Sequence, residues 1–237
     1  MSDTATEVSR LCNGGVPASL PGGYRGYGRR IGRPLRNELG NATYHLTSRG
    51  SDRRDIYWTD DDRWLFLRLL GIVTVKYEWT LLAYCLMTNH YHLVVRIGDG
   101  GLSDGMKWLN GGFSRITNRA HCREAHLFRN RFRSTLVESE AQLARTCRYV
   151  ILNPVRAGLC ERPEEWPWSS YRATAGLDPR PAFLADAEVL SLSGASFDDG
   201  RRRYREFVAE GVAQLAHSDE RPARDTLVAV SDTATGV

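Results

Sequence analysis

Residues 79–97 read Trp79-Thr-Leu-Leu-Ala-Tyr-Cys-Leu-Met-Thr-Asn-His-Tyr-His-Leu-Val-Val-Arg-Ile97. Two apolar, β-rich runs, Trp79–Leu86 and His90–Ile97, flank a three-residue turn, which predicts a β-hairpin. Alternation along the second run puts Tyr91 and three aliphatic side chains on one face, and His90 with His92 on the other. Two imidazoles therefore project side by side, at a spacing that can chelate one metal ion. A lone His-x-His pair is weak evidence, because most such pairs are ordinary surface or core residues.

Four further segments surround this hairpin. Thr43–Arg49 alternates polar and apolar residues as a half-buried strand does, and Arg131–Val137 alternates in the same way. Thr59 with Asp62 predicts a capping box at the start of a helix. A second helix is expected from Ser103. Its inward residues should be Met106, Leu109, Phe113, Ile116 and Ala120.

A third helix is expected to begin at Ser139, with Gln142 three residues further on, and to stop at Pro154. The order strand, helix, strand, strand, helix, strand, helix is typical of an α+β, ferredoxin-like antiparallel sheet. We therefore expect helices on one face of the sheet and an added C-terminal helix. This fold hosts many functions and does not by itself identify one.

The third predicted helix has a polar side. At 100° per residue, its apolar stripe comprises Leu143, Ala144, Cys147, Val150 and Ile151. Tyr149 lies off this stripe, and Asn153 follows one turn later, so the phenol hydroxyl and the amide oxygen could approach one point. The simpler interpretations are an amphipathic tyrosine that packs its ring, and an asparagine that ends a helix.

The charge pattern predicts a polyanion partner. The formal net charge is only +4, but 30 of the 32 basic residues are Arg, since Lys occurs only at Lys76 and Lys107. Arg suits bidentate phosphate contacts, although a GC-rich genome would also enrich it. From Gly105 to Thr135 there are seven Lys or Arg residues against one acid, Glu124. Such a concentration is typical of a nucleic-acid site.

The ends of the chain have little pattern. Residues 1–36, rich in Gly, Pro and Arg, predict a flexible basic arm. Residues 177–237 predict an extension that is partly helical or disordered, with a short charged helix possible at Arg201–Ala213. No apolar run approaches the roughly 18–20 residues that a membrane helix needs, and no signal-peptide pattern is present. Five scattered cysteines without a C-x-x-C pair predict reduced thiols. We expect a cytoplasmic protein with no membrane partner.

Two stretches resemble signature motifs of a known family. Met87-Thr-Asn-His-Tyr-His-Leu-Val-Val95 and Tyr149-Val-Ile-Leu-Asn-Pro-Val-Arg-Ala-Gly-Leu159 are similar to those of the REP-associated tyrosine transposases, a branch of the HUH single-strand-DNA endonucleases. Tyr44-His-Leu-Thr-Ser-Arg-Gly50 and Trp166-Pro-Trp-Ser-Ser170 resemble two further family stretches. The resemblance covers about residues 40–176, and its joint motifs are more specific than any one alone. Thr88 departs from the proline expected in the turn.

The resemblance implies roles for four residues. His90 and His92 would be paired metal ligands, Asn153 the third protein ligand and Tyr149 the nucleophile, in an HUH tyrosine transposase catalytic domain spanning residues 37–176. The metal expected from such mixed nitrogen and oxygen ligands beside phosphate is Mg²⁺ or Mn²⁺. Attack by Tyr149 would give a 5′-phosphotyrosine intermediate in single-stranded DNA, on the way to strand transfer. The implied substrate is hairpin-forming, palindromic repeat DNA, and the implied location is the bacterial cytoplasm, in association with the nucleoid.

Candidate DNA contacts lie on several segments. They are His45, Arg49, Arg53, Arg54, Arg115, Arg119, Arg129, Arg131, Arg133 and Arg156. Each could instead be a solvated surface charge. The alternative function is a catalytically silent, single-strand nucleic-acid-binding regulator of the same fold. A related replication-initiation or plasmid-mobilising nuclease is a second alternative. The oligomeric state stays open: a monomer suffices if the third helix folds back on its own sheet, and a homodimer is required if it reaches a partner.

Overall fold

A computed structural model of the chain describes residues 38–99, 101–192 and 197–217. Its sheet has four strands, β1 (Thr43–Arg49), β2 (Thr80–Leu86), β3 (His90–Arg96) and β4 (Arg133–Val137). They are ordered β2-β3-β1-β4 and every neighbouring pair is antiparallel. This is the predicted ferredoxin-like α+β fold, and the predicted hairpin forms its β2–β3 pair. The predicted basic arm, residues 1–36, lies outside the described residues.

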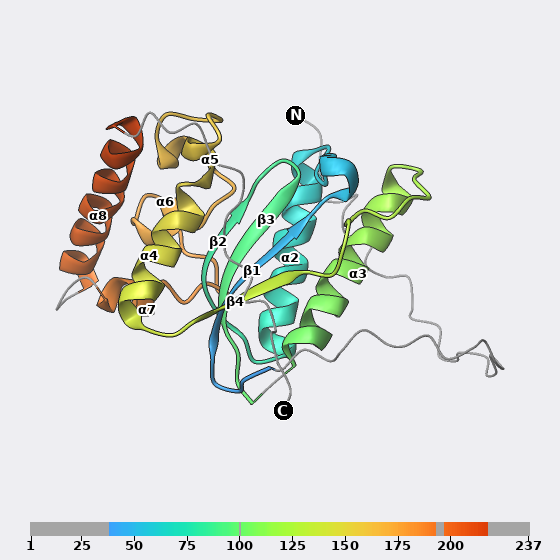
Figure 1. The fold of residues 1–237 in the computed structure, drawn as a ribbon, viewed down its shortest axis with the longest axis horizontal. Helices are drawn as coiled ribbons and strands as arrows, with labels where there is room; N and C mark the ends of the chain where they lie inside the picture. The colour runs from blue at the N-terminus through green and yellow to red at the C-terminus, as the bar shows by residue number, and fades with distance from the viewer. Residues whose placement is uncertain (1–37, 100, 193–196, 218–237) are drawn as a thin grey trace, which may run out of the picture. The chain divides into compact units, whose positions relative to one another are not determined.

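One face of the sheet packs against two long helices, α2 (Asp60–Lys76) and α3 (Leu102–Ala120), as Figure 1 shows. Register places Leu46 of β1 opposite Leu93 of β3, and both are fully buried with Phe66 of α2 and Phe113 of α3. Apolar alternation along β1 and β3 thus supplies one side of the main core.

The start of α2 follows the predicted capping box. The Thr59 hydroxyl accepts a hydrogen bond from the Asp62 backbone N–H (3.4 Å), and the Asp62 carboxylate accepts one from the Thr59 N–H (3.0 Å). Asp62 also contacts the His121 ring at 2.9 Å, which joins the start of α2 to the residue after α3.

The inward face of α3 differs from the prediction at its C-terminal end. Met106, Leu109 and Phe113 are buried, but Ile116 is 41% exposed and Ala120 is also exposed. Thr117 is buried instead. The reason is helical spacing: Thr117 lies one full turn beyond Phe113, on the line that faces the sheet.

The other face of the sheet is covered by the added helix. Helix α4 (Glu140–Ile151) begins after Ser139, whose hydroxyl accepts from the Gln142 N–H, and ends before Pro154 as predicted. A second core joins the α4 stripe to the sheet, through Ala83, Cys85, Val94, Leu143, Cys147, Val150 and Ile151. The short helix α5 (Asn153–Arg156) follows directly.

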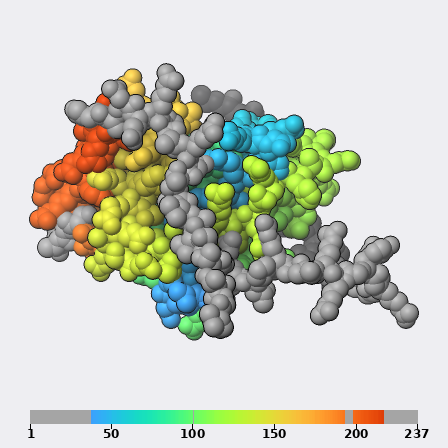
Figure 2. Space-filling view, viewed as in Figure 1, coloured from blue at the N-terminus to red at the C-terminus, as the bar shows by residue number. Residues whose placement is uncertain are grey.

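The chain after residue 156 adds short elements and one long helix. These are η2 (Pro163–Glu165), α6 (Tyr171–Thr174), α7 (Asp186–Ser191) and α8 (Phe197–His217), while η1 (Ser51–Arg53) follows β1. Helix α8 is longer than the short helix expected at Arg201–Ala213. Its Tyr204 and Val208 are buried in the second core, and Figure 2 shows α8 beside α4. Among the described residues, no helix is both long and apolar enough to cross a membrane.

Candidate active site

The two histidines of β3 lie on the sheet face beneath α4. Antiparallel register pairs His90 with Arg49 and His92 with Thr47, and directly paired residues present their side chains to the same face. The His90 and His92 ring centroids are 5.0 Å apart. Strand periodicity therefore brings the two imidazoles together, as the sequence predicts.

The proton on His90 can be assigned from its neighbours. His90 Nδ1 lies 2.7 Å from Asn89 Oδ1, while Asn89 Nδ2 donates to the Arg53 carbonyl at 2.9 Å and so fixes the orientation of the amide. Because Asn89 Oδ1 can only accept, His90 Nδ1 carries the proton. The lone pair of the neutral ring then belongs to Nε2, and this arrangement is typical of histidines that ligate metals.

His92 lies deeper in the site. Its side chain is 6% exposed, and its Nδ1 is 2.9 Å from Nε2 of His45 on β1. Its own Nε2 is buried and has no hydrogen-bond partner within the described part of the chain. Burial, together with His45 and His90, lowers the pKa of His92 well below its usual value, and burial lowers the pKa of His45 to about 4. Both rings are therefore neutral at pH 7, which is the form that binds metals.

Tyr149 reaches the histidines from the last turn of α4. Its ring lies edge-on to His92, with centroids 5.9 Å apart, and edge-on to His45 at 6.0 Å. The Arg156 guanidinium lies 5.1 Å from the centre of the same ring. Tyr149 is half-buried against the second core, so it is less separate from the packing than its helical position suggests. Helix α4 of one chain thus brings the tyrosine to the histidines of its own sheet.

Asn153 lies at the junction of α4 and α5. Sequence spacing places it one turn beyond Tyr149 on the polar side of one helix, but α4 ends at Ile151 and Asn153 is 9% exposed. Its Nδ2 donates to the carbonyls of Tyr149 (3.0 Å) and Val150 (3.3 Å). Since both partners are acceptors, the amide orientation is fixed, and Oδ1 is the atom left to act as a ligand.

The donor set fits a hard divalent cation. In the described ranges, no group of three His, Cys, Asp or Glu side chains could hold a metal, so any site here needs a ligand of another type. The unpartnered Nε2 of His92, the assigned tautomer of His90 and the fixed amide of Asn153 provide two nitrogens and one oxygen. Mixed imidazole and amide ligation suits Mg²⁺ or Mn²⁺ when phosphate oxygens complete the shell.

Three of the predicted DNA contacts lie close to this site. Arg49 is paired with His90, and Arg133 is paired with Thr47, the partner of His92, so both share the face of the imidazoles. Arg156 lies against Tyr149. Arg131 is exposed in the bend that precedes β4.

The other predicted contacts divide into two groups. Arg53, Arg54 and Arg129 are exposed, and the Arg129 N–H donates to the Arg49 carbonyl at 3.0 Å. Arg115 and Arg119 are also exposed, but they lie on α3, which packs on the opposite face of the sheet.

His45 corrects the sequence interpretation. It is 4% exposed and lies beneath the site, so it is not part of a DNA-facing surface. Alternation places His45 on the polar face of its strand, and the sequence leaves open whether the third helix folds back over that face. Its proximity to His92 depends on strand register, which the motif alone does not give.

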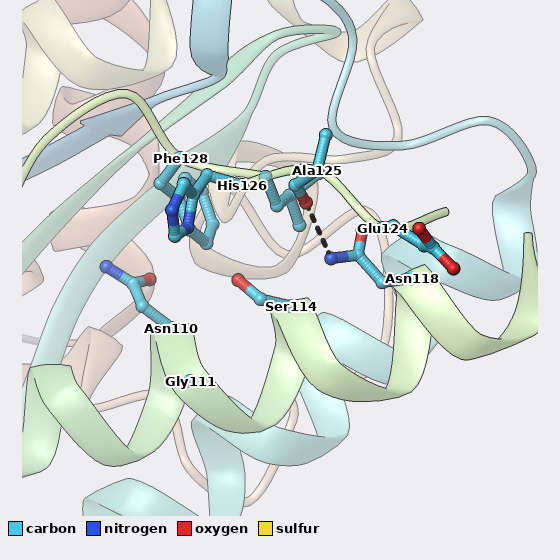
Figure 3. A pocket seen from close by; sticks show the side chains of 9 residues that line it. Asn110, Gly111, Ser114, Asn118, Glu124, Ala125, His126 and Phe128 are labelled. Carbon is cyan, nitrogen blue, oxygen red and sulfur yellow. Dashed lines mark hydrogen bonds between the residues drawn. The ribbon is translucent and has the colours of Figure 1, made fainter. Parts of the chain in front are cut away.

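A groove of about 290 Å³ lies away from these residues, between α3 and the segment 124–128 (Figure 3). Its lining includes Asn110, Ser114, Asn118, His126 and Phe128. Asn110 accepts a hydrogen bond from the Tyr91 hydroxyl at 2.6 Å, and Tyr91 faces the main core. The groove therefore adjoins the face of the sheet opposite to the imidazoles.

Comparison with known proteins agrees with the motifs and the fold. The profile of the family described as "Transposase IS200 like" matches residues 38–153. A Haemophilus influenzae protein provisionally named as a REP-associated tyrosine transposase is 27% identical over 129 residues, and the match covers 50% of this chain and 73% of that protein. A solved REP-associated tyrosine transposase bound to a REP hairpin aligns with a TM-score of 0.53 at 18% identity, covering 65% of this chain and 90% of that one. That structure supports the fold. Residues 38–153, which include the histidine pair, Tyr149 and Asn153, belong to the IS200-like transposase family.

Proposed function

We propose that the chain is a metal-dependent enzyme that cleaves single-stranded DNA with Tyr149 and transfers the strand, acting on hairpin-forming repeat DNA. The observation that carries the proposal is the position of the Tyr149 ring, 5.9 Å from the ring of His92, whose buried Nε2 lacks a partner among the described residues. A buried polar atom without a partner is costly in a structure that only needs to be stable. A cation bound at that nitrogen, with the tyrosine ring beside it, would account for it.

The metal would be held by His90, His92 and Asn153. When bound, it supplies Lewis acidity at the scissile phosphate, offsetting the charge that develops there. The protein supplies the imidazole of His90, whose Nδ1 proton is held by Asn89, the buried imidazole of His92, and an amide whose nitrogen is tied to the end of α4. These hydrogen bonds orient the ligands before the DNA arrives.

Tyr149 would supply the attacking oxygen. Its hydroxyl oxygen forms a bond to phosphorus as the phenol proton is lost, and the bond from phosphorus to the 3′ oxygen breaks. That oxygen takes up a proton and becomes a 3′-hydroxyl, while the 5′ phosphate stays on the tyrosine. The energy of the phosphodiester is retained in this bond, so a 3′-hydroxyl can later reverse the step and join a strand. The Arg156 guanidinium beside the ring favours the negative charge that develops on the phenol oxygen.

The substrate class follows from the charged surface and the relatives. Arg49 on β1 and Arg133 on β4 share the face of the imidazoles, on one side of β3, and Arg156 lies over the tyrosine. A phosphate backbone crossing this face would therefore meet several guanidinium groups. The solved relative is described as bound to a REP hairpin, which favours hairpin repeat DNA as the substrate here.

The test is cleavage of hairpin DNA with single-stranded flanks, taken from the repeats around the chain's own gene. We expect Mg²⁺ or Mn²⁺ to give a cut strand and a covalent protein–DNA band on a denaturing gel. Excess chelator, His90→Ala and His92→Ala should each abolish both products and leave most hairpin binding intact. Cleavage at full rate in excess chelator would contradict the proposal. Binding without any cleavage in either metal would favour the silent, DNA-binding regulator.

A further inference from the structure

His45 occupies a buried position beside both reactive groups of the proposed site. It pairs with Val94 of β3 and Thr135 of β4, and its side chain lies on the same face as His92. The His45 and His92 rings are nearly parallel, at 17°, with centroids 5.1 Å apart. The Tyr149 ring meets the His45 ring edge-on at 6.0 Å.

The contact between His45 Nε2 and His92 Nδ1, 2.9 Å long, can hold only one proton. If His45 donates, neutral His92 must carry its own proton on Nε2, where the described residues offer no acceptor. If His92 donates, its Nε2 presents a lone pair to the site. The second arrangement leaves an atom that a cation can satisfy, whereas the first leaves a buried N–H that a cation would repel.

We propose that His45 is a positioning residue: it accepts the His92 Nδ1–H and so holds His92 with the Nε2 lone pair directed at the metal. The inference rests on the proposed function, because it concerns the same cation site. His90 is arranged in a parallel way, since its Nδ1–H is accepted by Asn89 Oδ1. Each imidazole therefore has its own acceptor, one from the turn before β3 and one from the neighbouring strand.

The variants separate the hydrogen bond from the packing. His45→Phe keeps a ring of similar size against His92 and Tyr149 but cannot accept a proton, whereas His45→Gln restores an acceptor. His126→Phe, at an exposed histidine of the α3 groove, is the matched control. Mn²⁺ binding to the full chain is measured by titration calorimetry. Loss of such an outer hydrogen bond typically weakens metal binding about 10- to 100-fold. We expect that loss for His45→Phe, recovery of most of the affinity for His45→Gln, and no change for His126→Phe.

A second readout follows the proton itself in metal-free protein. Long-range ¹H–¹⁵N NMR correlations report which imidazole nitrogen carries hydrogen. His92 should carry its proton on Nδ1 in the wild type and in His45→Gln, and a large share should move to Nε2 in His45→Phe. Cleavage by His45→Phe should recover when Mn²⁺ is raised to saturation, because Tyr149 is retained. A role in packing alone would change neither the tautomer nor the metal requirement.

The outcomes distinguish this inference from the proposed function. Wild-type Mn²⁺ affinity in His45→Phe, or equal losses in His45→Phe and His45→Gln, would overturn the role of His45. Unchanged Mn²⁺ binding in His90→Ala and His92→Ala would instead overturn the cation site, whatever His45 does. Should His45→Phe fail to fold, His45→Gln and His45→Leu form the deciding pair, with affinity kept in the first and lost in the second.

Discussion

Helices cover both faces of the sheet, but the two faces are organised differently. Toward α2 and α3, the buried layer is mainly apolar, with Leu46 and Phe66 at its centre. The polar atoms buried there without a partner in the described ranges, in Tyr57, Trp79 and Thr117, belong to separate side chains. Toward α4, the buried layer includes His45 and His92, joined to each other at 2.9 Å, with one ring nitrogen lacking a partner. Burial on the first face stabilises the fold. On the second face the buried polar groups are two adjacent imidazoles next to the Tyr149 ring, and such a cluster, which is costly to desolvate, is expected of a binding site.

The largest difference between the two faces is expected when one hydroxyl oxygen is removed from each. Tyr149→Phe removes the attacking atom, and we expect neither cut strand nor adduct, with hairpin binding close to wild type. Tyr91→Phe removes the hydroxyl that donates to Asn110 on the other face. It should keep cleavage and lower the free energy of unfolding by about 1 kcal/mol. Gel assays with both variants, alongside denaturant unfolding, test the pair. Cleavage by Tyr149→Phe would mean that water or another tyrosine attacks.

A core truncation on the α2–α3 face should show the opposite behaviour. Leu46 is fully buried opposite Leu93, so Leu46→Ala leaves a cavity and should lower the free energy of unfolding by about 2–5 kcal/mol. Cleavage per folded molecule should be close to wild type at temperatures well below the unfolding midpoint. Chemical denaturation and single-turnover cleavage measure the two effects. A loss of cleavage larger than the loss of folded protein would show that the faces are coupled.

The salt dependence of DNA binding should also differ between Arg variants on the two sides of the sheet. The double variant Arg131→Ala, Arg133→Ala removes two positive charges close to the site. Each Arg that contacts a phosphate should account for just under about 1 in the slope of log affinity against log salt concentration. The control is Arg115→Ala with Arg119→Ala, on α3 across the sheet. We expect the first pair to lower the slope by almost 2 and the second to leave it nearly unchanged, measured by fluorescence anisotropy. The reverse pattern would place the DNA on the α3 side.

The smallest effect concerns the cap of α2. Burial alone would raise the pKa of Asp62, but hydrogen bonds from His121 and from the Trp58 and Thr59 N–H groups outweigh it and hold the pKa below its usual value. A carboxyl group whose pKa is lowered by folding stabilises the folded protein at pH values above its unfolded-state pKa. This stabilisation is lost as the pH falls through the folded-state pKa. We expect stability to fall as pH drops below about 3.8, and Asp62→Asn to remove that dependence at a cost of about 1 kcal/mol near neutrality. Urea unfolding between pH 2 and 6 measures it, and an identical acid slope in Asp62→Asn would contradict the assignment.

The sequence pattern is sufficient to predict those features whose residues are neighbours both in sequence and in space. The hairpin around His90 and His92, the capping box at Thr59 and the buried stripe of α4 all follow from periods of two or 3.6 residues. Tyr149 was singled out by the same reasoning, from its position off the stripe. The roles of nucleophile and metal ligand come from the motif resemblance, because the spacing of residues cannot indicate them.

The remaining features depend on tertiary packing. His45 lies against His92 through the register of β1 on β3, and a one-residue slip would have put it on the other face. Asn153 is buried because α4 ends two residues earlier and the amide ties its last carbonyls. Helix α8 extends beyond its predicted limits at both ends, and Leu215, past the predicted end, packs against the second core, a partner that the helix's charged sequence does not indicate.

If the Tyr149 hydroxyl oxygen is the nucleophile, the DNA must become attached to that residue. Peptide mapping of the trapped adduct tests this directly. Wild-type protein is incubated with hairpin DNA and Mn²⁺, denatured, digested with nuclease and protease, and analysed by mass spectrometry. We expect a single modified peptide that contains Tyr149, with a residual nucleotide attached to that side chain through a 5′ phosphate. A nucleotide on any other tyrosine, or a cut strand with free 5′ phosphate and no modified peptide, would contradict it.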